Sequence, residues 1–383
     1  MSRFTFFTHL ECAACGTKHS IRLRNVCERC GKSLAARYDL AGARRALDRR
    51  QPSREGLWRW PALLPARSEK EIVTLGEGGT PLLDSPPLAE MLGVRHVWIK
   101  EEGLNPTGSF KSRGLAAAVT MAKALGAKHV GLPTAGNAGG ALAAYAARAG
   151  LQATIVAPKD TPQANLIEIR EAGARLILVE GTIADAAARF RRERERKDIF
   201  DLSTLREPYR VEGKKTMGYE IAEQLGWRLP SVIIYPCGGG TGILGMWKAF
   251  EEMRSLGWIR GRFPRMIAAQ AKDCAPLVAA MRDGTEDSAA PRHPRTFASG
   301  LRVPKPFADW WILRILRASE GAAIAVGDAA MRRAIRTLTR ATGVFFCPEG
   351  AACWPAAQQL KLGRKDDVVI FNTAAGQKYL DVL

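Results

Sequence analysis

From about residue 94 onward, short apolar runs rich in β-branched residues alternate with longer helical patterns. This alternation is typical of βαβ units, in which helices cover the faces of mostly parallel sheets. The sequence therefore predicts an α/β fold whose ligands bind in loops at the carboxyl ends of the strands. The predicted strands are residues 94–100, 128–133, 153–158, 174–180, 231–236, 265–270, 322–326 and 367–372. The predicted helices between them include residues 140–150, 165–173, 184–197, 214–226 and 243–253.

Four cysteines near the start of the chain form two C-x-x-C pairs, Cys12 with Cys15 and Cys27 with Cys30. Two such turns supply four thiolates for a tetrahedral Zn²⁺ ion, and a closed four-cysteine site is structural because no position is left for substrate. The spacing predicts a zinc-ribbon-like segment over residues 1–40, with unmetallated buried thiols as the alternative. A partly helical connector is predicted over residues 41–75. The other four cysteines are scattered through apolar sequence, which fits a reducing compartment better than a disulfide framework.

The chain has 57 lysine and arginine residues against 38 aspartate and glutamate residues, a net charge of +19. Such an excess favours anionic partners, which include nucleic acid, membrane surfaces and phosphorylated metabolites. The basic residues are scattered through helical stretches such as 189–197, and no aromatic residue lies between the two cysteine pairs. We therefore expect a solvated basic surface and no nucleic-acid partner, with a nucleic-acid-binding protein on a retired enzyme scaffold as the alternative.

The longest uncharged run, residues 129–147, contains Pro133, Asn137 and several glycines, so it does not fit a membrane span. The first residues lack the basic region, apolar core and cleavage site of a signal peptide. We expect a cytoplasmic protein with no membrane partner.

The loop Pro236-Cys237-Gly238-Gly239-Gly240-Thr241-Gly242 lies between a predicted strand and a predicted helix. Glycines let consecutive backbone N–H groups converge on an anion, and the helix N-terminus adds partial positive charge, so this loop predicts a phosphate site. Gly240, Gly242 and Gly245 also satisfy G-x-G-x-x-G, but the next strand ends near Gln270 without the acidic residue that holds a ribose. A glycine-rich tight turn is the alternative.

Lys111 follows a Gly-Ser turn and precedes a helix. Alone it fits a solvated surface charge, but a lysine Schiff base and a phosphate-binding glycine loop are together the two attachments that pyridoxal phosphate needs. The loop 133–140 offers N–H groups for a carboxylate and the Asn137 amide for a ring hydroxyl, and the loop 372–376 offers a hydroxyl at a strand end.

Four segments, NPTGSFKSRG (105–114), TAGNAGGA (134–141), PCGGGTG (236–242) and NTAAGQK (372–378), closely resemble fold-type II pyridoxal-phosphate enzymes. Within that group, the four-cysteine ribbon, LGEGGTPL (75–82) and EGKKT (212–216) resemble the threonine synthase family. The resemblance implies a tryptophan synthase β-like fold with two three-layer α/β domains and mostly parallel sheets. The catalytic body would span residues 76–383, with a smaller subdomain over about 112–212 and a larger one formed by 76–111 and 213–383. It also implies a cytoplasmic homodimer that acts on a small-molecule substrate.

The resemblance also implies a role for each residue that matches a family motif. Lys111 would bind pyridoxal 5′-phosphate as a Schiff base and act as the catalytic base. The other cofactor contacts would come from Phe110, Asn137, Gly238, Gly239, Gly240, Thr241, Gly242 and Thr373, with Asn137 on the ring hydroxyl, the glycine loop on the phosphate and Thr373 on the pyridine nitrogen. The substrate contacts would come from Thr134, Ala135 and Gly136 on the α-carboxylate and from Arg210 and Lys214 or Lys215 on the phosphate, with ordinary surface charge as the alternative for the lysines.

The reaction implied converts O-phospho-L-homoserine and water into L-threonine and phosphate. Two departures leave the substrate open: Ser112 stands where many threonine synthases have Asp, and the glycine loop lacks the Asn that several of them carry. Threonine or serine ammonia-lyase activity, or β-replacement on phosphoserine, are the alternatives.

Overall fold

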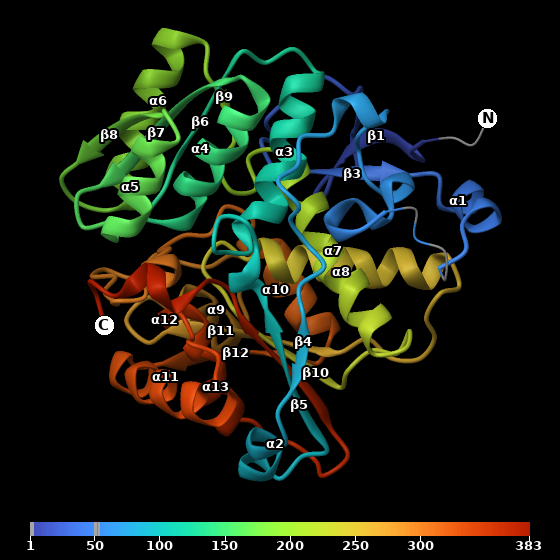
Figure 1. Ribbon diagram of the computed structural model, residues 1–383, viewed down its shortest axis with the longest axis vertical. Coiled ribbons are helices and arrows are strands. Elements are labelled where there is room, and N and C mark those ends of the chain that lie inside the picture. Colours follow the sequence, from blue (N-terminus) through green and yellow to red (C-terminus); the bar gives the residue numbers. More distant parts are fainter. Residues whose placement is uncertain (1–3, 50–51, 53) are drawn as a thin grey trace.

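The computed structural model describes residues 4–49, 52 and 54–383. Two α/β bodies, each built on its own sheet, lie one above the other in Figure 1, and a small antiparallel ribbon lies beside the upper body. The smaller sheet is in the upper body and the larger sheet in the lower one.

The larger sheet has the strand order β12-β11-β10-β13-β5-β4, and its neighbouring pairs are parallel except for β4 with β5 at one edge. Along β10, Ile233 and Tyr235 face one layer of helices, whereas Val232 and Ile234 face another, so both faces of the sheet are buried. The strands are β4 (Leu82–Asp84), β5 (His96–Glu101), β10 (Val232–Pro236), β11 (Arg265–Ala271), β12 (Ala322–Val326) and β13 (Asp367–Asn372). The first layer contains α7 (Tyr209–Gln224), α8 (Thr241–Ser255), α9 (Pro276–Arg282) and α10 (Asp309–Ala318). The second contains α2 (Pro86–Leu92), α11 (Asp328–Thr342), α12 (Pro348–Ala351) and α13 (Cys353–Gln358).

The smaller sheet is entirely parallel, with the order β8-β7-β6-β9. Helix α6 begins at a capping box formed by Thr182 and Asp185, and α4 ends at Gly150, whose left-handed backbone (φ +69°) favours glycine. The strands are β6 (His129–Pro133), β7 (Gln152–Pro158), β8 (Arg175–Val179) and β9 (Phe200–Asp201). Helices α3 (Lys111–Ala124), α4 (Asn137–Ala149) and α5 (Gln163–Glu171) cover one face, and α6 (Ile183–Lys197) covers the other.

The ribbon consists of β1 (Phe7–Cys12), β2 (Lys18–His19) and β3 (Leu34–Tyr38), followed by α1 (Leu40–Ala46). The predicted connector is partly helical as expected, and its residues 50, 51 and 53 lie outside the described residues. Short 3₁₀ helices occupy Gly56–Arg59, Pro61–Leu63, Glu69–Glu71, Glu102–Leu104, Ser299–Leu301 and Gly376–Tyr379.

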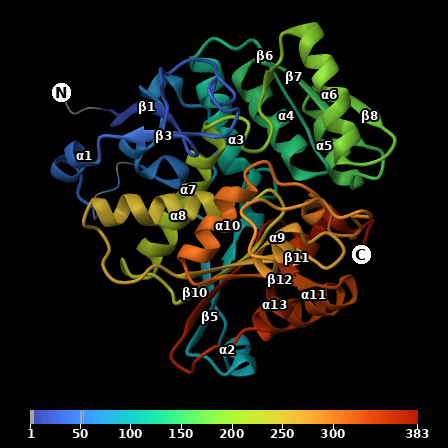
Figure 2. The same cartoon turned by 180° about the vertical axis from the view of Figure 1, so that it is seen from behind.

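Helix α7 joins the two bodies, because it packs on α8 of the larger body and on α3 of the smaller one. Seen from behind in Figure 2, α7 and α8 lie below the ribbon and between the two sheets. A fully buried ion cluster lies at this junction: Nε of Arg113 is 2.7 Å from Oε2 of Glu102, and Nη1 of Arg113 is 2.6 Å from Oε1 of Glu220. Lys100 joins it with Nζ 2.7 Å from Oε2 of Glu220. Burial would raise the pKa of Glu220, but the charges of Arg113 and Lys100 outweigh it and hold the pKa below its usual range.

All eight predicted strand segments are strands, and the predicted fold class is confirmed. The sequence missed the very short strands, such as β4 and β9, since two or three residues carry too little periodicity. The limits of the two subdomains stay a prediction. No helix within the described residues is long and apolar enough to cross a membrane.

Candidate active site

A cavity of about 350 Å³ lies where the carboxyl ends of strands from both sheets meet. Its volume falls in the range of small-molecule sites. The four loops singled out in the sequence all contribute to its wall. The predicted site residues on the wall are Phe110, Lys111, Thr134, Ala135, Gly136, Asn137, Gly238, Gly239, Gly240, Thr241 and Thr373.

Lys111 is the first residue of α3, and its side chain enters the cavity beside Phe110, with Nζ 4.5 Å from the ring centroid. Burial in the cavity and then the positive charge of Arg210 lower the pKa of Lys111 to about 7, while the Glu349 carboxylate acts in the opposite direction. A large fraction of the side chain is therefore a neutral amine near pH 7. A neutral amine is the form that attacks a carbonyl group and that accepts a proton.

The glycine loop, Gly238–Gly240, connects β10 to α8. Gly240 has φ +77°, and a Cβ atom there would lie 2.1 Å from Cδ1 of Ile312. A Cβ atom on Gly239 would lie 2.7 Å from Cγ2 of Thr204, so this loop has no room for side chains. Its backbone faces the cavity at the N-terminus of α8, which suits an anion. Gly242 is inside α8, where a Cβ atom would meet the Tyr235 ring, and it does not reach the wall.

Asn137 begins α4, and its Nδ2 donates to the Tyr379 hydroxyl over 2.7 Å. Its Oδ1 is buried and has no hydrogen-bond partner in the described part of the chain. Because a buried polar atom without a partner is costly, this amide fits a ring substituent of a bound molecule. Burial and the neighbouring Glu349 carboxylate raise the pKa of Tyr379 well above its ordinary value, so the phenol stays protonated.

Thr373 follows β13, and its backbone oxygen accepts a hydrogen bond of 2.9 Å from the Phe110 backbone N–H. Its hydroxyl lies 3.6 Å from Sγ of Cys347, whose pKa is raised above its usual range by burial. The hydroxyl therefore lies beside a neutral thiol. The same backbone bond ties the strand end that carries Thr373 to the loop that carries Lys111.

Sequence reasoning missed Glu349 and Tyr379, which both lie on the wall. Oε1 of Glu349 accepts a hydrogen bond of 2.8 Å from the Gly300 N–H. Glu349 is the only charged residue in the apolar run 344–357. A lone carboxylate in such a run could have indicated a buried functional group. Tyr379 carries no such signal, because its place in the cavity depends on how the segment after β13 folds back.

Arg210 and Lys214 do not lie on the wall. Both are on α7 and almost fully buried; Nη1 of Arg210 donates to the Leu202 carbonyl over 2.9 Å, and Nζ of Lys214 donates to the Phe110 carbonyl. Burial, with Lys111 and Arg210 nearby, lowers the pKa of Lys214 well below its usual value. Lys215 is also buried, paired with Glu212 and Glu252. Surface charge is therefore the wrong interpretation of these lysines, whereas contact of Arg210 and Lys214 with a substrate phosphate stays a prediction.

Other basic side chains do reach the cavity. They come from α6, from the segment after β9 and from the segment before α10, and we call them the basic rim: Arg191, Arg194, Arg206, Arg302 and Lys305. Arg302 spans the two bodies, with Nη2 2.8 Å from Oδ2 of Asp160. The helical pattern of α6 gave no sign that part of its charged face lines a cavity.

A family model described as "Pyridoxal-phosphate dependent enzyme" matches residues 73–374. The threonine synthase of Methanosarcina acetivorans is 34% identical over 373 residues, which cover 95% of this chain and 91% of that protein. The chain is a pyridoxal-phosphate dependent enzyme of the threonine synthase family. The threonine synthase of Synechocystis is 38% identical over 296 residues, which cover 76% of this chain and 73% of that protein.

Solved structures share the fold of this pyridoxal-phosphate enzyme. Maize serine racemase has a TM-score of 0.66 at 22% identity, covering 78% of this chain and 88% of that one. Diaminopropionate ammonia lyase from Escherichia coli has a TM-score of 0.67 at 18% identity, covering 84% of this chain and 94% of that one. At these identities the likeness shows the fold alone.

The residues present fit the family's cofactor. The amine of Lys111, the crowded glycine loop at a helix N-terminus and the unpartnered Asn137 oxygen lie on one cavity wall. They match the aldehyde, the phosphate and the ring hydroxyl of pyridoxal phosphate.

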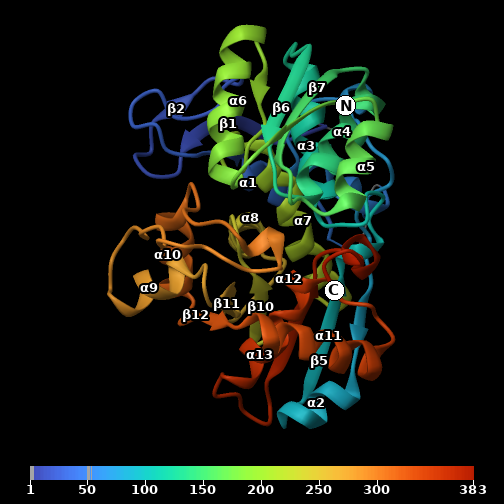
Figure 3. The same cartoon turned by 90° about the vertical axis from the view of Figure 1, so that its left-hand side faces the viewer.

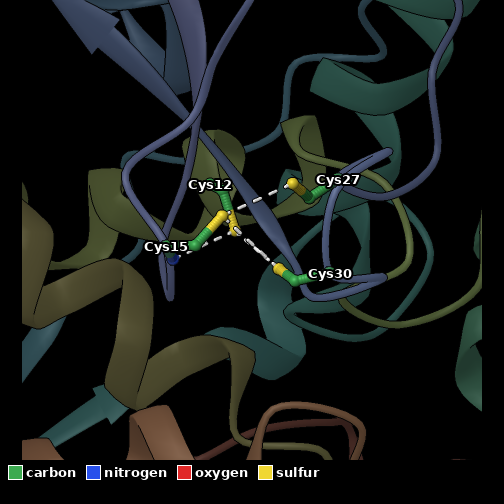
Figure 4. Close-up of side chains that lie close together, drawn as sticks. All are labelled: Cys12, Cys15, Cys27 and Cys30. Carbon is green, nitrogen blue, oxygen red and sulfur yellow. Dashed lines mark hydrogen bonds between the residues drawn. The ribbon is translucent and has the colours of Figure 1, made fainter.

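The four cysteines of the ribbon point toward one another in Figure 4, and their Sγ atoms all lie within 4.8 Å of one another. The Sγ atoms of Cys12 and Cys30 are 3.4 Å apart, and those of Cys15 and Cys27 are 3.7 Å apart. Zn–S bonds of about 2.3 Å in a tetrahedron place sulfur atoms about 3.8 Å apart. His19 adds Nε2 3.4 Å from Sγ of Cys27, which suits an outer-shell contact. The cluster therefore fits one tetrahedral metal ion.

Proposed function

We propose that this enzyme is a threonine synthase that converts O-phospho-L-homoserine and water into L-threonine and phosphate. The observation that carries the proposal is the 34% identity to a threonine synthase over 95% of this chain and 91% of that protein. The basic rim supports it, since a phosphorylated substrate needs cationic groups beyond those that hold the cofactor phosphate.

Pyridoxal phosphate, when bound, supplies an electron sink for the charge that develops when Cα of the substrate loses a proton. The amine of Lys111 removes protons at Cα and then at Cβ and returns them. As the bond between Cγ and the ester oxygen breaks, the electron pair leaves with the phosphate. Cγ gains a proton to become a methyl group, and water adds its hydroxyl at Cβ, so the atoms of both substrates are accounted for.

The other wall residues bind and orient. Thr134, Ala135 and Gly136 bind the α-carboxylate, while Asn137 and Thr373 fix the plane of the cofactor ring. The basic rim holds the phosphate that leaves, with Arg210 as a further charge behind the wall. The Thr373 hydroxyl, unlike a carboxylate, would leave the pyridine nitrogen largely unprotonated, which favours elimination over transamination.

The test is to incubate the cofactor-loaded protein with O-phospho-L-homoserine and to measure phosphate and threonine together. Equal amounts of both are expected, and none with Lys111→Ala. Two-oxobutyrate formed from threonine, without threonine formed from O-phospho-L-homoserine, would replace the proposal with the ammonia-lyase alternative. Turnover of phosphoserine without turnover of O-phospho-L-homoserine would instead favour the β-replacement alternative.

We further propose a cytoplasmic homodimer with one structural zinc ion per chain. The fit of the four thiols to a tetrahedron supports the zinc. Metal analysis of the purified protein and light scattering after size-exclusion chromatography test the zinc content and the dimer.

A further inference from the structure

The segment 201–206 begins at the last residue of β9 and forms a part of the cavity wall that has no counterpart among the predicted loops. Asp201, Ser203, Thr204 and Arg206 all lie on the wall. Thr204 packs on the glycine loop so closely that a Cβ atom on Gly239 would lie 2.7 Å from its Cγ2. The position of this segment therefore affects both the glycine loop and one arginine of the basic rim, Arg206.

The backbone of this segment is strained. Leu205 has φ +61°, a left-handed conformation that a non-glycine residue adopts only when its surroundings impose it. Its side chain is buried in the core of the larger body, with 1% of its surface exposed. Contacts outside the segment must therefore hold this conformation.

Two of those contacts come from the ribbon. Nδ2 of Asn25 donates to the Asp201 carbonyl over 2.6 Å, and Oγ of Ser33 donates to the Leu205 carbonyl over 2.8 Å. The two carbonyls lie near opposite ends of the segment, so the ribbon holds both ends. Figure 3 shows the ribbon at the left of the molecule, above α10.

Both donors flank the second cysteine pair. Asn25 lies two residues before Cys27, and Ser33 lies three residues after Cys30. The turn between them is closed by a bridge between Val26 and Ser33 and by a hydrogen bond of 3.0 Å from the Cys27 N–H to the Lys32 carbonyl. A metal ion held by the four thiols would fix this turn, and with it the two donors.

We propose that the four-cysteine ribbon braces the active site: Asn25 and Ser33 are positioning residues for segment 201–206, and metal bound by the cysteines keeps them in place. This inference rests on the proposed function in one respect: segment 201–206 lines the cavity in which we place the reaction. The ribbon thereby makes substrate binding depend on the metal, although no thiol reaches the cavity wall within the described residues.

The first experiment is hydrogen–deuterium exchange on the cofactor-loaded protein, comparing wild type with the double variant Asn25→Ala/Ser33→Ala. In the double variant we expect unchanged zinc content, unchanged cofactor absorbance and exchange about 5- to 10-fold faster in peptides covering residues 201–206. The KM for O-phospho-L-homoserine should rise about 3- to 10-fold, with a smaller change in kcat. Unchanged exchange in 201–206 with zinc retained would overturn the proposal.

Thr8→Ala is the matched control. The Thr8 hydroxyl donates to the Arg37 carbonyl over 2.9 Å, so this variant removes a hydrogen bond inside the ribbon without touching the segment. Exchange in 201–206 and the KM should match wild type. An equal effect in Thr8→Ala would assign the change to general loosening of the ribbon and would overturn the role of Asn25 and Ser33.

The second experiment removes the metal from the folded protein with a chelator and follows the same peptides. Faster exchange in 201–206, reversed by added Zn²⁺, is expected. A protein that binds no zinc, or whose exchange is unchanged after zinc is removed, would overturn the dependence on metal. Hydrogen–deuterium exchange can be measured without turnover. If exchange in 201–206 changes as expected but the protein makes no threonine, the proposed function is refuted, whereas the positioning role of the ribbon is not.

Discussion

The two walls of the cavity differ in what they are made of. The wall assigned to the cofactor consists of backbone groups and short side chains at strand ends, together with one lysine. The wall assigned to the substrate phosphate consists of long charged side chains that reach in from α6 and from two irregular segments. The shape of the first wall is fixed by the ends of the strands and by glycines that have no side chain. The shape of the second wall depends on how distant segments pack together. Under the proposed function, the first wall would carry the chemistry common to the family, and the second would select the phosphorylated substrate.

The largest effect is expected from Lys111→Ala, which removes the amine from the cofactor wall. Threonine formation should fall by at least about 1,000-fold, and the absorption band of the covalently bound cofactor should disappear. Lys123→Ala, an exposed position near the end of the same helix, is the control and should behave as wild type. A band that persists in Lys111→Ala would mean that another lysine binds the cofactor.

Gly240→Ala tests the backbone part of the same wall. Its φ of +77° and the contact with Ile312 leave no room for a methyl group, so cofactor affinity should fall by about 10- to 100-fold. Titration of the cofactor-free protein with pyridoxal phosphate measures this change. Gly327→Ala, where a Cβ atom would meet nothing within 4 Å, is the control. If both variants bind the cofactor equally well, the glycine loop is not its phosphate site.

Arg206→Ala tests the substrate wall. Loss of one guanidinium from the basic rim should raise the KM for O-phospho-L-homoserine by about 10-fold, because a hydrogen bond to a charged group is being lost. Cofactor affinity should stay within about two-fold of wild type. Arg192→Ala, an exposed position of α6 that does not reach the cavity, should change neither quantity. A matching loss of cofactor affinity in Arg206→Ala would break the distinction between the two walls.

Glu349→Gln should have the smallest effect, visible in pH dependence. The carboxylate raises the pKa of Lys111, so its removal lets that pKa fall below its value of about 7. A larger fraction of Lys111 is then a neutral amine at pH 6, and the cofactor-free protein should take up pyridoxal phosphate about three-fold faster there, with no difference at pH 9. Glu195→Gln, which also removes a carboxylate from the wall, is the control, because Glu195 does not shift the pKa of Lys111. Slower uptake at pH 6 would reverse the sign and refute this role of Glu349.

The sequence predicted the fold and most of the cofactor wall because both depend on local signals. Alternating apolar runs mark strands whose faces are both buried, and glycines mark positions without room for a side chain. The basic rim was not predictable, since Arg191 and Arg194 lie on a helix whose charged face is typical of one exposed to water. For Lys214 and Lys215 the sequence left surface charge open as the alternative, because their burial depends on helix packing that no local pattern encodes.

The ion cluster around Arg113 affects how such an enzyme can evolve. Arg113 lies two residues after Lys111 on the same helix. The cluster holds two cations and two carboxylates, so replacing any one member leaves one buried charge uncompensated, at a cost of about 3–5 kcal/mol. Exposed arginines of the basic rim can be replaced singly for about 0.5 kcal/mol or less. The fold therefore tolerates single substitutions in the basic rim, whereas the helix that carries Lys111 can change its buried charges without loss of stability only through several substitutions that occur together.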